Sequence, residues 1–344
     1  MCRRGRTIGT ASADIISEAA EVDGFIPYPV NLDLPAILSL ILRLRRMGFS
    51  RAVYADSSGV SERILKRYIY LMRAGGISNL IGFHPHNPQN RPVAPYANSY
   101  PQKSEALLRL DNLARDGIDV SVESDLSSSL LVLPAAVLHE AKGWLRERRS
   151  RLERPLIGIC PGAASPANIW PVERFIEVGR RLMQLDRYEI VVCGGRAERT
   201  IGDRMIAEWG QGINAAGHLP VLGSAAILQD CMFMVGLDSG TTHLSAAVGV
   251  PCVTLQGGRM LPGYWDPLGT GHIIVRYPVN CVGCCRTSCV TPKHPCMRGI
   301  TVETVWQAVL KMQERLTGTG TSRSSGPNAN APLETAINAP STCV

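Results

Sequence analysis

The chain has 344 residues, of which 45% are hydrophobic and 19% charged, and these proportions exclude a largely disordered protein. This length is large for a single hydrophobic core and suits two domains of about 150 residues each. The net charge of +7 is modest, and the basic clusters lack interleaved aromatic residues, so we expect no nucleic-acid partner. No apolar run approaches the length of about 18 residues that spans a bilayer, and the N-terminal segment has no signal-peptide core.

In the N-terminal part of the chain, the sequence predicts helices separated by short strands. Apolar spacing predicts a helix over residues 36–47, and Asp33 is expected to cap its start. Strands are predicted within residues 51–56 and 77–83, and a further helix over residues 133–149.

The expected boundary between two domains lies after the helix at residues 133–149. A linker near residues 150–155 would separate a first domain, residues 1–150, from a second, residues 155–316. Residues 317–344 are rich in Thr, Ser, Gly, Asn and Pro, which predicts a disordered tail.

In the second half, three apolar runs each lead into a turn that contains glycine. The run at 156–160 leads to a small-residue turn at 161–165, and the run at 188–192 leads to Cys193-Gly-Gly195. The third run, 232–237, leads to a turn at residues 238–240. Strands that alternate with helices predict an α/β fold with parallel sheets, in which ligands bind beyond the carboxyl ends of the strands.

The turn at 238–240 predicts an anion site, because the helix expected over residues 241–248 would direct free N–H groups and a positive dipole end at it. Gly240 allows a phosphate to approach the backbone without a Cβ in the way. A nucleoside diphosphate fits such a place. The alternative is that Asp238 and Ser239 only cap the helix.

Glu198 follows the second of these turns and has two possible roles. Its carboxylate can accept hydrogen bonds from both hydroxyls of a ribose. Alternatively, it is a helix-start glutamate that the helix dipole favours.

In their order and spacing, these motifs resemble glycosyltransferase family 9, the ADP-heptose:lipopolysaccharide heptosyltransferase family. The resemblance extends through a cysteine-rich segment, residues 281–296, to about Leu316. The motifs that carry it are Pro161-Gly-Ala, Trp170-Pro-x-Glu-Arg-Phe175, Cys193-Gly-Gly195 with Glu198, Asp238-Ser-Gly-x-x-His-Leu-x-Ala-Ala247, Gly249-x-Pro251 and Trp265-Asp-Pro-Leu-Gly269.

The resemblance implies a GT-B architecture, in which two Rossmann-like domains face a cleft. The first domain would bind the acceptor and the second the sugar nucleotide. The implied reaction is inverting transfer of a sugar, commonly a heptose, from a nucleoside-diphosphate sugar such as ADP-heptose to a lipopolysaccharide-core or related glycan, with no cofactor. A lipid-linked saccharide acceptor implies a cytoplasmic protein that can attach peripherally to the inner face of the inner membrane.

The resemblance also assigns the donor site. Ala163, Ala164 and Ser165 would lie by the diphosphate, Glu198 at the ribose, Leu219 near the base, and Asp238 at the transferred sugar. Ser239, Gly240 and Thr241 would donate hydrogen bonds to the phosphates, and His243 would orient the loop or contact phosphate.

One departure concerns Asn168, because members of the family commonly carry lysine at this position. Asparagine supplies no charge to the departing diphosphate, and a lost charge of this kind costs about 2 kcal/mol in the transition state. Arg196 and Arg199 are the candidates to compensate.

A second departure concerns the catalytic base. The family begins with a strand, a Gly-Asp turn and a helix, and the aspartate of that turn is the expected base, but the chain lacks this unit. We therefore expect an N-terminal domain that is incomplete at its start, with Asp56 as the weak candidate for the base. The alternative is a catalytically impaired relative that binds sugar nucleotides.

The eleven cysteines raise a further alternative. Cys281, Cys284, Cys289 and Cys296 could together bind zinc, which would suggest a metal-stabilised module for acidic partners. Because only one C-x-x-C pair occurs, we favour reduced thiols without a metal.

Overall fold

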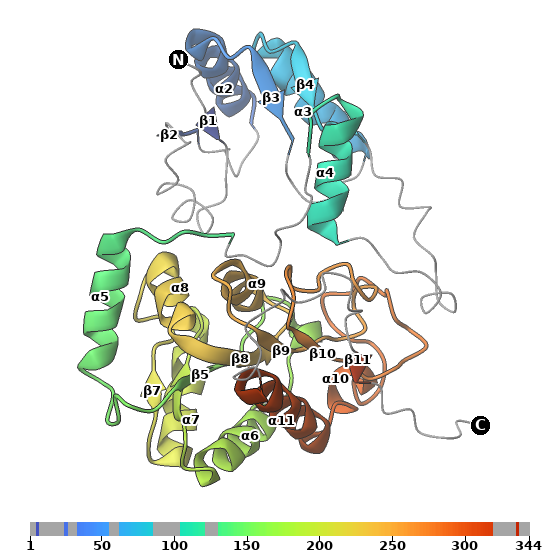
Figure 1. Cartoon of the computed structure of the whole chain (residues 1–344). Coiled ribbons are helices and arrows are strands. Elements are labelled where there is room, and N and C mark those ends of the chain that lie inside the picture. The colour runs from blue at the N-terminus through green and yellow to red at the C-terminus, as the bar shows by residue number, and fades with distance from the viewer. Residues whose placement is uncertain are drawn as a thin grey trace. The chain divides into compact units, whose positions relative to one another are not determined.

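The computed structural model describes residues 5–6, 24–26, 33–54, 62–84, 104–120, 130–318 and 335–336 (Figure 1). The chain divides into two compact units. Unit 1 comprises Met1–Val93 and Pro101–Val122, and unit 2 comprises Ala94–Tyr100 and Glu123–Val344.

Unit 1 contains helices that pack beside short parallel strands. The described elements are α2 (Leu34–Met47), α3 (Glu62–Ala74), α4 (Glu105–Arg115), the strand pair β1 (Gly5–Arg6) and β2 (Gly24–Phe25), and the pair β3 (Arg51–Val53) and β4 (Asn79–Ile81). Asp33 caps α2, since its Oδ1 accepts a hydrogen bond of 2.8 Å from the amide of Ala36, which confirms the predicted cap. Leu40 and Leu44 of α2 pack with Leu71 of α3 in the core of this unit.

Among the described residues, the sheet of unit 2 has seven parallel strands in the order β11-β10-β9-β8-β5-β6-β7. Its strands are β5 (Leu156–Cys160), β6 (Glu189–Val192), β7 (Ile213–Asn214), β8 (Cys231–Leu237), β9 (Cys252–Leu255), β10 (Ile273–Val275) and β11 (Thr335–Ala336). From β5 the chain continues to β6 and β7 on one side, whereas β8, β9 and β10 lie on the other side. The strand order therefore reverses between β5 and β8, which is where open α/β sheets bind their ligands.

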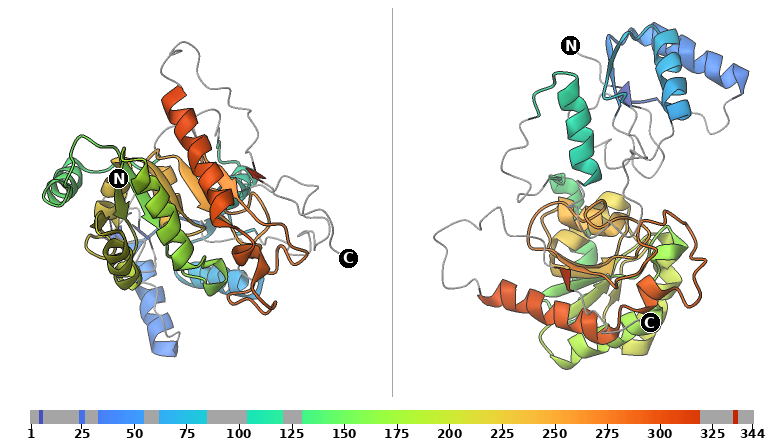
Figure 2. Two further views of the ribbon diagram at one scale, coloured as in Figure 1. Left: turned by 90° about the horizontal axis from the view of Figure 1, so that it is seen from below. Right: turned by 90° about the vertical axis from the view of Figure 1, so that its right-hand side faces the viewer.

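Helices cover both faces of this sheet (Figures 1 and 2). One face carries α6 (Val172–Gln184), α7 (Arg199–Trp209) and α11 (Val302–Gly318), and the other carries α5 (Ala135–Arg146), α8 (Val221–Gln229) and α9 (Gly240–Ala247). Strands buried on both faces read as continuous apolar runs, which explains why β5 and β8 lack polar alternation.

The core of unit 2 is anchored by aromatic residues on α6 and just before it. Trp170 lies edge-on to Phe175, with ring centroids 4.8 Å apart. The indole Nε1 of Trp170 donates a hydrogen bond of 2.9 Å to the carbonyl of Ile300, two residues before α11. This contact joins the segment before α6 to the segment before α11.

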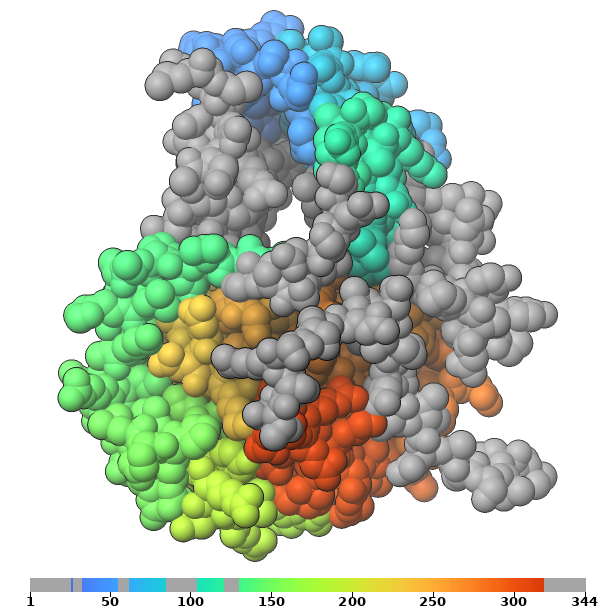
Figure 3. Space-filling view, viewed as in Figure 1, coloured from blue at the N-terminus to red at the C-terminus, as the bar shows by residue number. Residues whose placement is uncertain are grey.

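The predicted α/β class, the parallel sheet and the strands before the three glycine turns are confirmed. Helix α5 packs against α8, and the two meet at the surface of unit 2 (Figure 3), so unit 2 includes the segment before the expected linker at residues 150–155. The expected domain bounds stay a prediction, and most of the expected tail lies outside the described residues, although β11 pairs with β10. In the described part of the chain, no helix combines the length and apolar character required to cross a membrane.

Two helix glycines allow a matched test of packing in unit 2. A Cβ at Gly179 would overlap the indole of Trp209, whereas a Cβ at Gly143 would meet no atom within 4 Å. Gly179→Ala should destabilise the protein by about 1–3 kcal/mol through overpacking, and Gly143→Ala should stabilise it by about 0.5–1 kcal/mol. Urea unfolding of both variants checks this, and equal effects would contradict the packing of α6 on α7.

Candidate functional site

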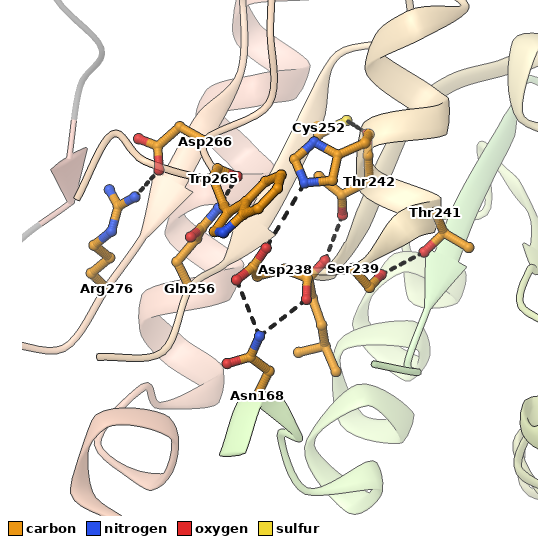
Figure 4. Close-up of polar contacts among 12 residues, drawn as sticks. Asn168, Asp238, Ser239, Thr241, Thr242, Cys252, Gln256, Trp265, Asp266 and Arg276 are labelled. Atoms are coloured by element: carbon orange, nitrogen blue, oxygen red, sulfur yellow. Dashed lines mark hydrogen bonds and ion pairs between the residues drawn. The ribbon is translucent and has the colours of Figure 1, made fainter. Parts of the chain in front are cut away.

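The turns that follow β5 and β8 meet at the carboxyl edge of the sheet. Strand pairing places Cys160 beside Gly236. Asn168 then joins the two segments, because its Nδ2 donates hydrogen bonds to the carbonyl of Asp238 at 3.2 Å and to its Oδ2 at 3.1 Å (Figure 4). Residues 168 and 238, far apart in the sequence, thereby form one side of the predicted donor site.

The carboxyl group of Asp238 is strongly perturbed. Its side chain is only 11% exposed, and burial raises its pKa from 3.8 to about 6. The positive charge of Arg259 and the hydrogen bond from Asn168 oppose this rise. A carboxyl held in this way titrates close to neutral pH, as groups at functional sites often do.

Helix α9 presents free backbone amides at its start. The amides of Thr242 and His243 donate to the carbonyl of Ser239, at 3.1 and 3.4 Å. Among the residues that the structure describes, no protein acceptor faces the amides of Gly240 and Thr241. These two amides are available to an anion.

Side chains at this turn contact one another and leave the helix uncapped. The hydroxyl of Ser239 lies 2.8 Å from that of Thr241, and it makes no capping hydrogen bond with α9. The hydroxyl of Thr242 donates a hydrogen bond of 2.6 Å to the carbonyl of Leu237. The structure therefore disfavours the alternative in which Asp238 and Ser239 only cap the helix.

His243 lies one turn into α9 and faces Asp238. Its Nε2 is 4.0 Å from Oδ1 of Asp238, and its ring packs edge-on against Trp265 with centroids 5.8 Å apart. Burial lowers the pKa of His243, so the ring is neutral at pH 7. This arrangement supports an orienting role for His243, and contact with phosphate stays a prediction.

Sequence reasoning missed the residues that hold Trp265 and Asp266 against the site. The Nε2 of Gln256 donates a hydrogen bond of 3.1 Å to the carbonyl of Trp265, and Arg276 forms a buried ion pair with Asp266 (Figure 4). Gln256 directly follows β9 and Arg276 directly follows β10. Polar residues immediately after buried strands were the signal that could have identified them.

Glu198 bridges the turns after β5 and β6. Its Oε2 accepts a hydrogen bond of 2.8 Å from the amide of Gly195, and its side chain lies so close to Gly162 that a Cβ there would overlap it. The structure thus shows Glu198 in its capping role, and contact with a ribose stays a prediction. Leu219, predicted near the base, is half-buried and lies just before α8.

The expected diphosphate residues lie in the turn after β5. Ala163 is half-buried, Ala164 is exposed, and the hydroxyl of Ser165 donates a hydrogen bond of 3.1 Å to the carbonyl of Thr287. The weak candidate for the base, Asp56, lies outside the described residues.

The cysteine-rich segment contains both exposed and buried thiols. Cys296 is buried, Cys281 and Cys289 are half-buried, and Cys284 is exposed. Within the described ranges, no group of three or more His, Cys, Asp or Glu residues is arranged to hold a metal ion. The zinc alternative therefore finds no preformed site in this structure.

Comparisons with known proteins show which family and which relatives the chain is similar to. The family model described as Glycosyltransferase family 9 (heptosyltransferase) matches residues 97–294. Lipopolysaccharide heptosyltransferase 2 of Salmonella typhimurium is 31% identical over 132 residues, which cover 36% of this chain and 37% of that protein. The chain thus matches well under two thirds of the length of this relative.

Solved structures show a similar fold over most of the chain. The crystal structure of a family 9 glycosyltransferase from Veillonella parvula has a TM-score of 0.67 and 18% identity, and the match covers 91% of this chain and 88% of that one. The E. coli ADP-heptose lps heptosyltransferase II has a TM-score of 0.63 and 20% identity, with 92% and 90% covered. The GT-B class of fold predicted from the sequence is confirmed.

The raised pKa of Asp238 predicts how stability depends on pH. Between about pH 4 and pH 6 the folded state binds more protons than the unfolded state, so the free energy of unfolding falls as pH rises through this window. Asp238→Asn removes this effect and should gain on the order of 2 kcal/mol relative to wild type between pH 4 and pH 7. Urea unfolding across this range measures the difference, with the exposed Asp230→Asn as control. A difference that does not change with pH would refute the assignment.

The contact between Gly162 and Glu198 predicts a coupled pair of substitutions. Gly162→Ala should displace the Glu198 side chain, break its hydrogen bond to Gly195 and destabilise the protein by about 1 kcal/mol. In a Glu198→Ala background the same substitution should cost little, because the obstructing side chain is absent. A double-mutant cycle by urea unfolding tests this, and additive effects would show that the two residues do not interact.

Proposed function

The chain belongs to glycosyltransferase family 9 (heptosyltransferase), and we propose that it transfers a sugar from a nucleoside-diphosphate sugar to a saccharide acceptor. One observation carries the proposal. The amides of Gly240 and Thr241 lie unpaired among the described residues, at the point where the strand order reverses. A pyrophosphate is the ligand that such a helix start in an α/β sheet accommodates best.

For the donor, we propose ADP-heptose, the sugar nucleotide in the name of the related E. coli enzyme. The turn after β5, with Ala163, Ala164 and Ser165, would lie along the diphosphate. The Glu198 side chain would release its hydrogen bond from the amide of Gly195 and bind the ribose. Leu219 would lie near the base. Ligand binding can provide the free energy for such a local rearrangement.

For the acceptor, we propose a lipid-linked saccharide of the lipopolysaccharide core or a related glycan at a membrane surface. Arg43, Arg45 and Arg46 are exposed on α2, which carries no acidic residue. Such a cluster attracts an anionic surface at about 1 kcal/mol per basic residue. The proposed location is cytoplasmic, with peripheral attachment to the inner face of the inner membrane.

The proposed chemistry is inversion at the anomeric carbon. An acceptor hydroxyl attacks this carbon and loses its proton to a base, while the bond between the carbon and the diphosphate oxygen breaks. The amides of α9 stabilise the charge that develops on the departing diphosphate, and Asp238 faces the transferred sugar. Asp56 remains the weak candidate for the base.

The second candidate function is binding of sugar nucleotides without transfer, because no base for the transfer is identified among the residues that the structure describes. Calorimetry with the intact ADP-sugar separates the two functions when it is combined with a transfer assay on a lipopolysaccharide-core acceptor. Release of ADP that depends on the acceptor supports the enzyme, whereas binding without release supports the second function.

Gly240 offers a direct test of the diphosphate site. A Cβ at this position meets no protein atom within 4 Å, so Gly240→Ala should fold normally. The added methyl group would stand where the phosphate approaches, and we expect the affinity for ADP to fall about tenfold or more. Isothermal titration calorimetry measures this, with Gly143→Ala as the matched control. Wild-type protein that binds neither ADP nor UDP would overturn the proposed function.

A further inference from the structure

We propose that Arg259 provides the cationic group that binds the diphosphate of the sugar nucleotide and neutralises it as it departs. This inference rests on the proposed function. It assigns to the loop after β9 a phosphate-binding role that is separate from the amides of α9.

The topology places Arg259 at the correct edge of the sheet. Strand β9 pairs with β8, with Leu255 beside Leu237. Asp238 directly follows β8, and Arg259 lies four residues beyond the end of β9. Both residues therefore lie in loops that follow neighbouring strands at the carboxyl edge of the sheet, where the ligand is expected.

Two main-chain hydrogen bonds and one side-chain hydrogen bond hold Arg259 and the residue before it against the cysteine-rich segment. The carbonyl of Arg259 accepts from the amide of Cys285 at 2.8 Å, and that of Gly258 accepts from the amide of Gly283 at 2.8 Å. The Nε of Arg259 donates to the carbonyl of Arg286 at 3.0 Å. The guanidinium is thereby held against the cysteine-rich segment, with its orientation set before a ligand binds.

The cysteine-rich segment also contacts the turn after β5, which is predicted to lie along the diphosphate. The carbonyl of Thr287 accepts hydrogen bonds from the hydroxyl of Ser165 at 3.1 Å and from the amide of Ala167 at 3.0 Å. Arg259 and this turn thus bind to the carbonyls of consecutive residues, 286 and 287. The guanidinium consequently stands beside the turn that would lie along the diphosphate.

The charges of the site favour a cation beside the predicted diphosphate position. A nucleoside diphosphate is anionic, Asp238 adds a further carboxylate, and Asn168 is neutral. Arg276, whose charge also acts on Asp238, is paired with Asp266. In the part of the chain that the structure describes, no carboxylate forms an ion pair with Arg259. Its planar guanidinium is suited to phosphate oxygens.

The two arginines suggested by the sequence are less well placed. Arg196 and Arg199 follow β6, and β5 separates β6 from β8. Arg199 donates a hydrogen bond to the carbonyl of Gly217, on the β6 side of the sheet. Arg259, by contrast, lies in the loop after β9, and β9 pairs directly with β8.

The test compares the affinities of wild type and Arg259→Gln for ADP and for adenosine by calorimetry. We expect Arg259→Gln to weaken ADP binding about tenfold or more and to leave adenosine binding unchanged, because adenosine has no phosphate. Arg259→Lys should retain part of the affinity. The control is Lys293→Gln, which removes a positive charge from an exposed residue of the cysteine-rich segment and should bind ADP like wild type.

A second experiment places a positive charge at residue 168 in the variant that lacks Arg259. Adding Asn168→Lys to Arg259→Gln should restore part of the ADP affinity, provided that thermal unfolding shows the double variant to be folded. Arg259→Gln that binds ADP as tightly as wild type, while Gly240→Ala does not, would overturn this inference and leave the proposed function intact. Wild type that binds no nucleoside diphosphate would instead overturn both.

Discussion

The contact between Asn168 and Asp238 is the interaction on which the site depends. It joins the turn after β5 to the turn after β8, where the strand order of the sheet reverses. A single amide group holds both the backbone carbonyl and the carboxylate of Asp238. This fixes the carboxylate beside the start of α9 despite the cost of burying it, which appears as its raised pKa. The Oδ1 atom of Asn168 is itself buried without a protein partner among the described residues.

Around this contact, three different segments supply the free amides, the negative charge and the positive charge of the site. Helix α9 supplies uncompensated amides, the buried Asp238 supplies a negative charge, and the loop after β9 brings Arg259 to the same edge. In the interpretation proposed here, the amides bind the diphosphate and Arg259 balances its charge. Asn168 then positions Asp238, and Arg259, in the loop after β9, supplies the positive charge. The cysteine-rich segment connects these parts through main-chain hydrogen bonds and one hydrogen bond from the Arg259 side chain.

The strands and glycine turns of unit 2 could be predicted because they depend on local sequence. Buried strands read as apolar runs, and the turn after β8 follows its strand directly, as expected. The contact between Asn168 and Asp238 could not be predicted, since it joins residues far apart in the chain through strand pairing. The sequence identified Asn168 only as a missing charge. Glu198 was ambiguous for a related reason, because a carboxylate at that position suits both a ribose and a backbone amide.

A crystal structure of the protein with bound ADP tests the central claim most directly. The claim is that a diphosphate binds at the start of α9, where β8 ends. We expect phosphate oxygens within hydrogen-bonding distance of the amides of Gly240 and Thr241, with Asn168 still bound to Asp238. An ADP molecule bound elsewhere, with this turn empty, would contradict the account.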